Sequence, residues 1–134
     1  MSYRPDDVTT VTAYMTVRDA AAAIDFYKRA FEAEERYRMA RDADGAVEHA
    51  TLRIGDSTVY LADELGAVKS PVALGGSPVQ LFLYVPDCDA VWQRAIAAGA
   101  RVVVPMADQE WGDRYGLLED PFGHLWGIAT MKHA

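Results

Sequence analysis

Cysteine is almost absent from this chain, which has a single one, Cys88, among its 134 residues. One thiol excludes an internal disulfide framework and fits a reducing compartment, so we expect a cytoplasmic protein. Long apolar runs are also missing. None approaches the roughly 20 residues of a membrane-spanning helix, and the first residues lack the apolar segment of a signal peptide. We therefore expect no membrane partner.

Basic residues are few as well. The chain has 13 lysine and arginine residues against 20 acidic ones, for a formal net charge of −7. Nucleic-acid binders need a basic patch, so this balance argues against a nucleic-acid partner. An acidic surface would instead attract a cationic ligand. At this length the chain can bury a hydrophobic core as one domain, residues 1–134, without disulfides or a structural metal.

Two common catalytic motifs are absent. No Gly-x-Ser-x-Gly segment marks the nucleophile of a hydrolase. Gly75-Gly76 is followed by neither the Lys-Ser/Thr pair nor the helix of a phosphate-binding loop. Cys88 falls in the first turn of an expected helix, where a thiol can be activated, but the apolar spacing of that helix buries it. We expect Cys88 to be a packing residue.

What the chain does contain is an internal repeat. A Val-x-Asp sequence that ends at Asp19 recurs at Asp87, 68 residues later, and the same spacing separates Gly55 from Gly123. Two anchors with one spacing indicate two copies of a single unit. The expected units are residues 8–65 and residues 79–134, and the Ser-, Pro- and Gly-rich linker between them is residues 66–78.

Each unit is predicted to fold as strand–helix–strand–strand–strand, which gives an α+β fold. Alternating apolar and polar residues predict a first strand whose apolar face, which includes Val11 in one unit and Val79 in the other, lies toward a core. Asp19 and Asp87 stand at the N-cap of the next segment, and apolar residues at steps of three and four predict an amphipathic helix there. The strands are expected at residues 11–17, 34–40, 47–54 and 58–62, and at residues 79–85, 101–104, 115–119 and 125–130.

The face of each sheet opposite its helix combines aromatic and polar residues. Such a face is too aromatic for open solvent and too polar for a plain core, and clefts of this composition bind small molecules. The alternative is a hydrated interface between the two units. The expected ligand-binding residues are Tyr14, His49, Arg53, Tyr60, Gln80, Phe82, Tyr84, Trp111, Tyr115 and Glu119.

Three segments of the chain resemble those of a known protein family. They are the Val-x-Asp helix entry with Ile24–Tyr27, the terminal segment Glu119–His124, and the segment Asp108–Gly116. The first two are similar to the vicinal oxygen chelate superfamily, which contains glyoxalase I, extradiol dioxygenases, fosfomycin-resistance transferases and bleomycin-resistance proteins. The third resembles its glyoxalase/bleomycin-resistance branch. The resemblance implies two βαβββ modules with pseudo-twofold symmetry that form a cleft.

Metal-dependent members of that superfamily hold a metal with four His, Gln or Glu ligands on the inner strands. Matching the two patterns places these positions at Thr12, Tyr60, Gln80 and Gly127. Only Gln80 offers a suitable donor, whereas a metal needs three or more. His49 and Glu119 add at most two ligands outside the family's pattern. We therefore expect no metal and no cofactor.

Two residue pairs in the predicted cleft have alternative interpretations. His49 could be a general base with Glu119 as its partner, although we favour a hydrogen-bonded polar pair on the cleft floor. Trp111 and Tyr115 flank a predicted turn at residues 112–114. There they either stack on a planar ligand or close the rim of the cleft, and the sequence leaves this choice open.

These observations favour a metal-independent small-molecule-binding protein, similar to the drug-sequestering bleomycin-resistance proteins of antibiotic resistance. Its mechanism would be stoichiometric capture of an aromatic or cationic drug. In that branch two chains commonly pair and share each cleft, so the resemblance implies a homodimer. The alternative is a metal-dependent lyase, isomerase or dioxygenase of the glyoxalase type, with a metal held by His49, Gln80 and Glu119. A third interpretation is an interaction module with a vestigial cleft, and whether the chain is an enzyme stays open.

Overall fold

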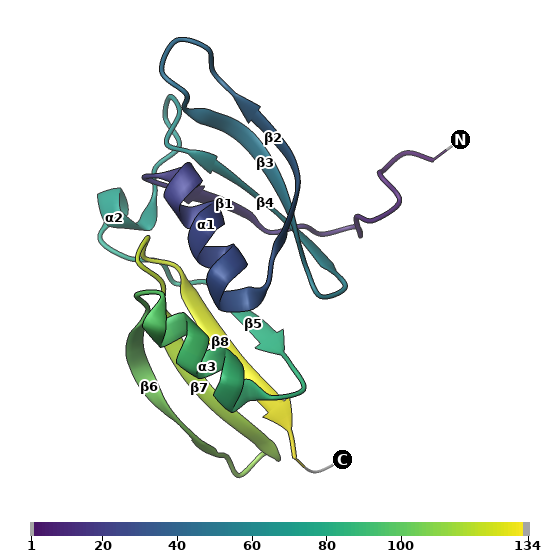
Figure 1. The fold of residues 1–134 in the computed structure, drawn as a ribbon, viewed down its shortest axis with the longest axis vertical. Coiled ribbons are helices and arrows are strands. Elements are labelled where there is room, and N and C mark those ends of the chain that lie inside the picture. The colour runs from purple at the N-terminus through teal and green to yellow at the C-terminus, as the bar shows by residue number, and fades with distance from the viewer. Residues whose placement is uncertain (1, 133–134) are drawn as a thin grey trace.

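The structure, a computed structural model, describes residues 2–132 and contains two four-stranded sheets (Figure 1). The elements are β1 (Tyr14–Val17), α1 (Ala20–Phe31), β2 (Glu34–Ala40), β3 (Val47–Ile54), β4 (Ser57–Asp63), α2 (Pro71–Leu74), β5 (Gln80–Tyr84), α3 (Cys88–Ala97), β6 (Arg101–Asp108), β7 (Asp113–Glu119) and β8 (Leu125–Met131). The strand order is β1-β4-β3-β2 in sheet 1 and β5-β8-β7-β6 in sheet 2. In each sheet the first pair is parallel and the others are antiparallel. The identical topology confirms the α+β prediction of two βαβββ modules.

The two long helices begin where the sequence predicts. The Asp19 carboxylate accepts a hydrogen bond from the backbone N–H of Ala22, at 3.1 Å, and Asp87 accepts the equivalent bond from Ala90, at 3.2 Å. These caps satisfy amides that have no partner inside the helix. Gly99, with φ of +119°, follows the end of α3 and allows the chain to leave the helix.

The core lies between the helices and the sheets. Both helices cover the same side of the molecule, and α1 packs against α3 (Figure 1). The ring of Phe31 on α1 lies 4.7 Å from that of Trp126 on β8, and Tyr27 lies 5.3 Å from the same indole. Cys88 is buried in this cluster, in agreement with its predicted packing role. One continuous core therefore joins both modules.

Asp120 ties the two modules together at the turn before β8. The side chain is 3 % exposed, and its Oδ2 accepts hydrogen bonds from the Tyr27 hydroxyl at 2.5 Å and Trp126 Nε1 at 2.8 Å. Oδ1 accepts from the backbone N–H groups of Phe122 and His124, at 2.9 and 3.0 Å. The predicted tight turn is present, and the same carboxylate also anchors α1.

Two predicted core residues are exposed. Val11 is 85 % exposed and Val79 is 63 % exposed, because each lies before the paired part of its strand. The alternating pattern therefore assigned them wrongly to the core. Within the predicted linker the chain forms α2, which Ser70 caps by accepting from the Ala73 N–H at 3.3 Å.

Strand β7 begins two residues earlier than expected, at Asp113. Residues 113 and 114 therefore belong to the strand rather than to the predicted turn, and Tyr115 lies within the strand, as predicted. Among residues 2–132, no helix has the length and apolar composition to cross a membrane.

Candidate functional site

The predicted ligand-binding residues lie on the sides of the two sheets that the helices leave open, in two separate groups. Face 1, on sheet 1, consists of Tyr14, Tyr37, His49, Thr51, Arg53 and Tyr60. Face 2, on sheet 2, consists of Gln80, Phe82, Tyr84, Asp113, Tyr115 and Glu119, with Trp111 from the preceding turn. Tyr37, Thr51 and Asp113 were missing from the predicted set.

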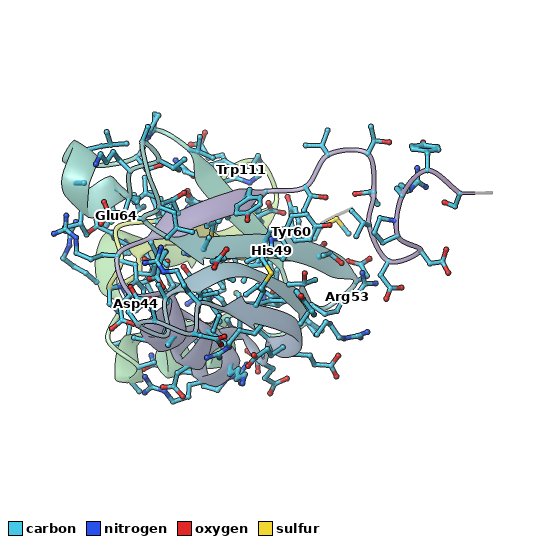
Figure 2. The ribbon with its side chains drawn as sticks, turned by 90° about the horizontal axis from the view of Figure 1, so that it is seen from above. Asp44, His49, Arg53, Tyr60, Glu64 and Trp111 are labelled. Carbon is cyan, nitrogen blue, oxygen red and sulfur yellow. The ribbon has the colours of Figure 1, made fainter. Side chains whose placement is uncertain are left out.

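Face 1 is built around His49. Its Nδ1 lies 2.9 Å from the Tyr14 hydroxyl, and its Nε2 lies 3.1 Å from Thr51 Oγ1. The Tyr60 ring meets the imidazole edge-on at 4.7 Å between centroids, and Figure 2 shows His49 and Tyr60 side by side. Tyr37, which belongs to β2 and was not in the predicted set, has its ring centroid 6.3 Å from that of His49.

Burial sets the charge of this cluster. Desolvation lowers the pKa of His49 below its ordinary value of 6.5, so the imidazole is neutral at pH 7. Burial, with a smaller contribution from Tyr60, raises the pKa of Tyr14 above 10.0. Because both groups are neutral, Tyr14 and His49 form a hydrogen-bonded pair and carry no ionic charge.

Arg53 holds the N-terminal arm at one end of face 1. Its Nη1 donates to the Asp7 carbonyl oxygen at 2.9 Å and to Thr58 Oγ1 at 3.1 Å. The Thr58 hydroxyl donates to the same carbonyl at 2.7 Å, and Arg36 adds an ion pair with the Asp7 carboxylate at 3.6 Å. The arm beyond this anchor extends away from the body (Figure 1). Arg53 therefore has a clear positioning role.

Face 2 is a platform of four aromatic rings. The rings of Phe82 and Tyr115 are stacked at 5.4 Å with an angle of 6° between their planes. Tyr84 lies 5.0 Å from Phe82, and Trp111 approaches Tyr115 at 5.7 Å and 60°. Tyr84 is 65 % exposed and Trp111 63 % exposed. Large aromatic area is thus available to a ligand.

Asp113 fixes the two most exposed rings of this platform. The residue is 5 % exposed, and its Oδ2 accepts from the Tyr84 hydroxyl at 2.8 Å and from Trp111 Nε1 at 2.9 Å. The hydrogen bond to Asp113 is the main reason why the pKa of Tyr84 is raised above 10.0. Counting back by two from Tyr115 would have placed Asp113 on face 2, but the sequence was interpreted as a turn there.

The positions that the family resemblance matches to metal ligands do not suit a metal here. Tyr60 pairs with Tyr14 in sheet 1, whereas Gly127 pairs with Phe82 in sheet 2. A Cβ at Gly127 would lie 2.8 Å from Phe82 and 3.0 Å from Tyr115, because those two rings cover the glycine. Among residues 2–132, no group of three or more His, Cys, Asp or Glu side chains could hold a metal. The Phe82 and Tyr115 rings thus occupy the space that a metal-binding side chain at Gly127 would need.

The predicted pairing of His49 with Glu119 is wrong within one chain. His49 lies in sheet 1 and contacts Tyr14 and Thr51, whereas Glu119 lies in sheet 2. The Glu119 carboxylate accepts from Arg101 Nη2 at 2.9 Å on the neighbouring strand. The error arose because face alternation gives the side of a sheet but not the distance between two sheets.

Two grooves follow the free edges of the first strands. A groove of about 770 Å³ runs along β5 and brings Arg53 of face 1 near Phe82 and Tyr84 of face 2. A second groove, of about 300 Å³, runs along β1 past Tyr14 and His124. Both lie at strands that have a neighbour on one side only. These edges are where the two faces approach each other within the chain.

A scan against protein-family models gives a match that spans residues 8–128, to the Glyoxalase/Bleomycin resistance protein/Dioxygenase superfamily. A curated protein of Mycobacterium tuberculosis, described as uncharacterized, is 48 % identical over 123 residues, which are 88 % of this chain and 72 % of that protein. A Mycobacterium bovis relative with the same description is equally identical over 80 % of its length.

Several solved structures share the fold. TioX from Micromonospora sp. ML1 superposes with a TM-score of 0.71 at 29 % identity, over 94 % of this chain and 98 % of TioX. A gene product of Arabidopsis thaliana superposes with a TM-score of 0.74 at 27 % identity, over 92 % of this chain and 98 % of that protein. The fosfomycin resistance protein FosX from Mesorhizobium loti superposes with a TM-score of 0.66 at 18 % identity, over 91 % of each chain. This likeness shows a common fold.

Proposed function

This chain belongs to the Glyoxalase/Bleomycin resistance protein/Dioxygenase superfamily, and we propose that it acts within that family as a metal-independent binder of planar aromatic small molecules, such as aromatic drugs. One observation carries the proposal. Face 2 presents four neighbouring rings, and the buried Asp113 carboxylate holds the polar ends of the two most exposed ones, Tyr84 and Trp111. A rigid aromatic surface loses little conformational entropy when a flat ligand stacks on it.

The donor chemistry supports binding over metal-dependent catalysis. Of the four positions matched to the family's ligands, Gly127 has no side chain and lies beneath Phe82 and Tyr115. Tyr14 and His49, the side chains on face 1 that could exchange protons, are already hydrogen-bonded to each other. A lyase, isomerase or dioxygenase would need a metal that this donor set does not favour. Stoichiometric capture, the mechanism of a resistance protein, needs only the platform.

The proposal is tested with acridone, a neutral planar tricycle, in a titration followed by calorimetry. Trp111→Ala removes the indole of face 2. We expect the affinity for acridone to fall about tenfold or more, since about 1.4 kcal/mol corresponds to one decade in affinity. The melting temperature should change little because the ring is largely exposed. The matched control is Tyr3→Ala, which removes an exposed ring on the N-terminal arm, outside both faces.

Two results would count against the proposal. If acridone and other flat tricycles fail to bind the wild-type protein at all, face 2 is not a ligand platform. If Trp111→Ala and Tyr3→Ala weaken binding equally, the contact is unspecific. Unfolding of Trp111→Ala would mean that the indole stabilises the fold, and Tyr84→Ala then replaces it in the same titration.

A homodimer is the second part of the proposal. The first strands β1 and β5 each have a free edge that lines a groove, and neither edge carries the lysine or proline residues that protect exposed strands. Phe82 is 44 % exposed beside one of these edges. Packing β1 of one copy beside β5 of another would cover both edges and join face 1 to face 2 across a shared cleft. Light scattering should give twice the chain mass, and a monomer at micromolar concentration would contradict this.

A further inference from the structure

We propose that face 2 selects planar aromatic cations, and that Asp113 is the residue that recognises their charge. The inference rests on the proposed function and names the class of its ligand. Its basis is an anomaly of the structure, namely a buried carboxylate that has no cationic partner. Among residues 2–132, no lysine, arginine or histidine nitrogen lies within 4.0 Å of the Asp113 carboxylate. Buried charges are almost always paired.

The hydrogen bonds of Asp113 leave one oxygen without a partner. Oδ2 receives both donors, the Tyr84 hydroxyl and Trp111 Nε1, whereas no described residue donates to Oδ1. Asp120, the deeply buried acid in the turn before β8, shows the contrast. Both of its oxygens accept two hydrogen bonds each. Asp120 is saturated and structural, and Asp113 keeps acceptor capacity for a donor from outside the chain.

Neighbouring charges do not compensate Asp113. Arg114 follows it in the sequence but points to the opposite side of the strand, where its guanidinium pairs with Asp89 at 3.1 Å and Asp108 at 3.3 Å. Arg114 is therefore held on the helix side by two carboxylates and does not neutralise Asp113. The field of the Asp113 carboxylate is left to act on the open side, among the aromatic rings.

The same carboxylate strengthens the attraction of the rings for a cation. An aromatic face attracts a positive charge through its quadrupole, and the interaction grows when water is excluded. Tyr84 and Trp111 both donate their polar hydrogen to Asp113, which orients the rings around the negative group. A flat ligand with a delocalised positive charge can stack on these rings and place an N–H near Oδ1. A flat anion of the same outline meets repulsion at that point.

The test compares three flat tricyclic probes of similar outline at neutral pH: proflavine, which is cationic, acridone, which is neutral, and anthracene carboxylate, which is anionic. We expect the wild-type protein to bind proflavine about tenfold more tightly than acridone, and anthracene carboxylate least tightly. Added sodium chloride should weaken proflavine binding and leave acridone binding nearly unchanged, because salt screens charge but not stacking.

Asp113→Asn isolates the charge. The amide oxygen can take the place of Oδ2 and keep both hydrogen bonds from Tyr84 and Trp111, while the NH₂ group replaces the free Oδ1. The preference for proflavine over acridone should disappear, because the amide carries no charge. The control is Asp42→Asn, which removes one negative charge from an exposed turn residue whose side chain has no hydrogen-bond partner among residues 2–132, and it should leave all three affinities as they are.

The outcomes separate this inference from the proposed function. If none of the three probes binds, the binding function itself is wrong. If acridone binds and proflavine binds no better, or if Asp113→Asn behaves like Asp42→Asn, the platform is real but charge recognition by Asp113 is refuted. Should Asp113→Asn fail to fold, the ranking of the probes on wild-type protein and its dependence on salt still decide between these results.

Discussion

Alanine at Gly127 tests whether the stacked pair on face 2 depends on the missing side chain. Gly127 lies on β8 directly beneath that pair, and an added Cβ would sit 2.8 Å from Phe82 Cδ2 and 3.0 Å from Tyr115 Cε1. Both distances are shorter than van der Waals contact, so the rings must move. Their outer sides are partly exposed, which leaves room for that movement away from the sheet.

The magnitudes predict a small effect on stability and a larger one on binding. Overpacking costs about 1–3 kcal/mol in a closed core, but here outward movement of two rings relieves most of it. Alanine also gains about 0.5–1 kcal/mol over glycine inside a strand. Loss of the stacked geometry removes about 0.5–1.5 kcal/mol of aromatic interaction. We expect the free energy of unfolding of Gly127→Ala to lie within about 1 kcal/mol of the wild-type value. The variant should bind acridone up to roughly tenfold more weakly.

Gly116→Ala supplies the matched control on the opposite side of the same sheet. Its Cβ would lie 2.6 Å from two ring atoms of the buried Trp92 and 3.0 Å from the Met106 Cα, which cannot move aside. This variant should lose about 2–3 kcal/mol or more in urea unfolding while the folded fraction keeps its affinity for acridone. If Gly116→Ala is as mild as Gly127→Ala, or if Gly127→Ala binds acridone like wild type, the stacked pair does not depend on the missing side chain at Gly127.

Two further predictions concern groups outside the aromatic platform. Asp120→Asn should lower the free energy of unfolding by roughly 2–4 kcal/mol in urea, because hydrogen bonds to a buried charged group contribute about 1.5–3 kcal/mol each. A loss as small as that of Asp42→Asn would disprove the joining role of Asp120. Burial lowers the pKa of His49 from 6.5. The contribution of the neutral imidazole to the free energy of unfolding is therefore complete above pH 6.5 and is lost as the pH falls through the lowered pKa. His49→Gln should remove this slope, and an NMR titration of His49 with a midpoint above 6.5 would contradict the assignment.

The sequence was sufficient to predict the modules because their signals are local. The N-caps at Asp19 and Asp87 act within one helical turn, and strand alternation needs only neighbouring residues. Alternation also placed Tyr14, Phe82 and Tyr84 on the open faces, as the structure confirms. It failed at Val11, where a strand pattern continues beyond the last residue that has a pairing partner.

The site itself depends on distances that no local pattern contains. His49 and Glu119 share an open face by parity, but they belong to different sheets and contact different partners. Asp113 was missed for a related reason. A Trp-Gly-Asp segment is typical of a turn, and only the pairing of β7 with β8 shows that Asp113 already belongs to the strand.

Comparison of the two modules shows how one backbone acquired two different faces. Strand register makes Tyr60 and Gly127 equivalent, because each pairs with the equivalent aromatic residue of its own first strand, Tyr14 or Phe82. On face 1 the Tyr60 ring fills the centre, so His49 meets Tyr14 through a hydrogen bond. On face 2 the centre is glycine. The residue equivalent to His49, Tyr115, can therefore lie flat against Phe82. Glycine at this position thus leaves room for the flat stacking of Phe82 and Tyr115 on face 2, whereas tyrosine fills the equivalent place on face 1.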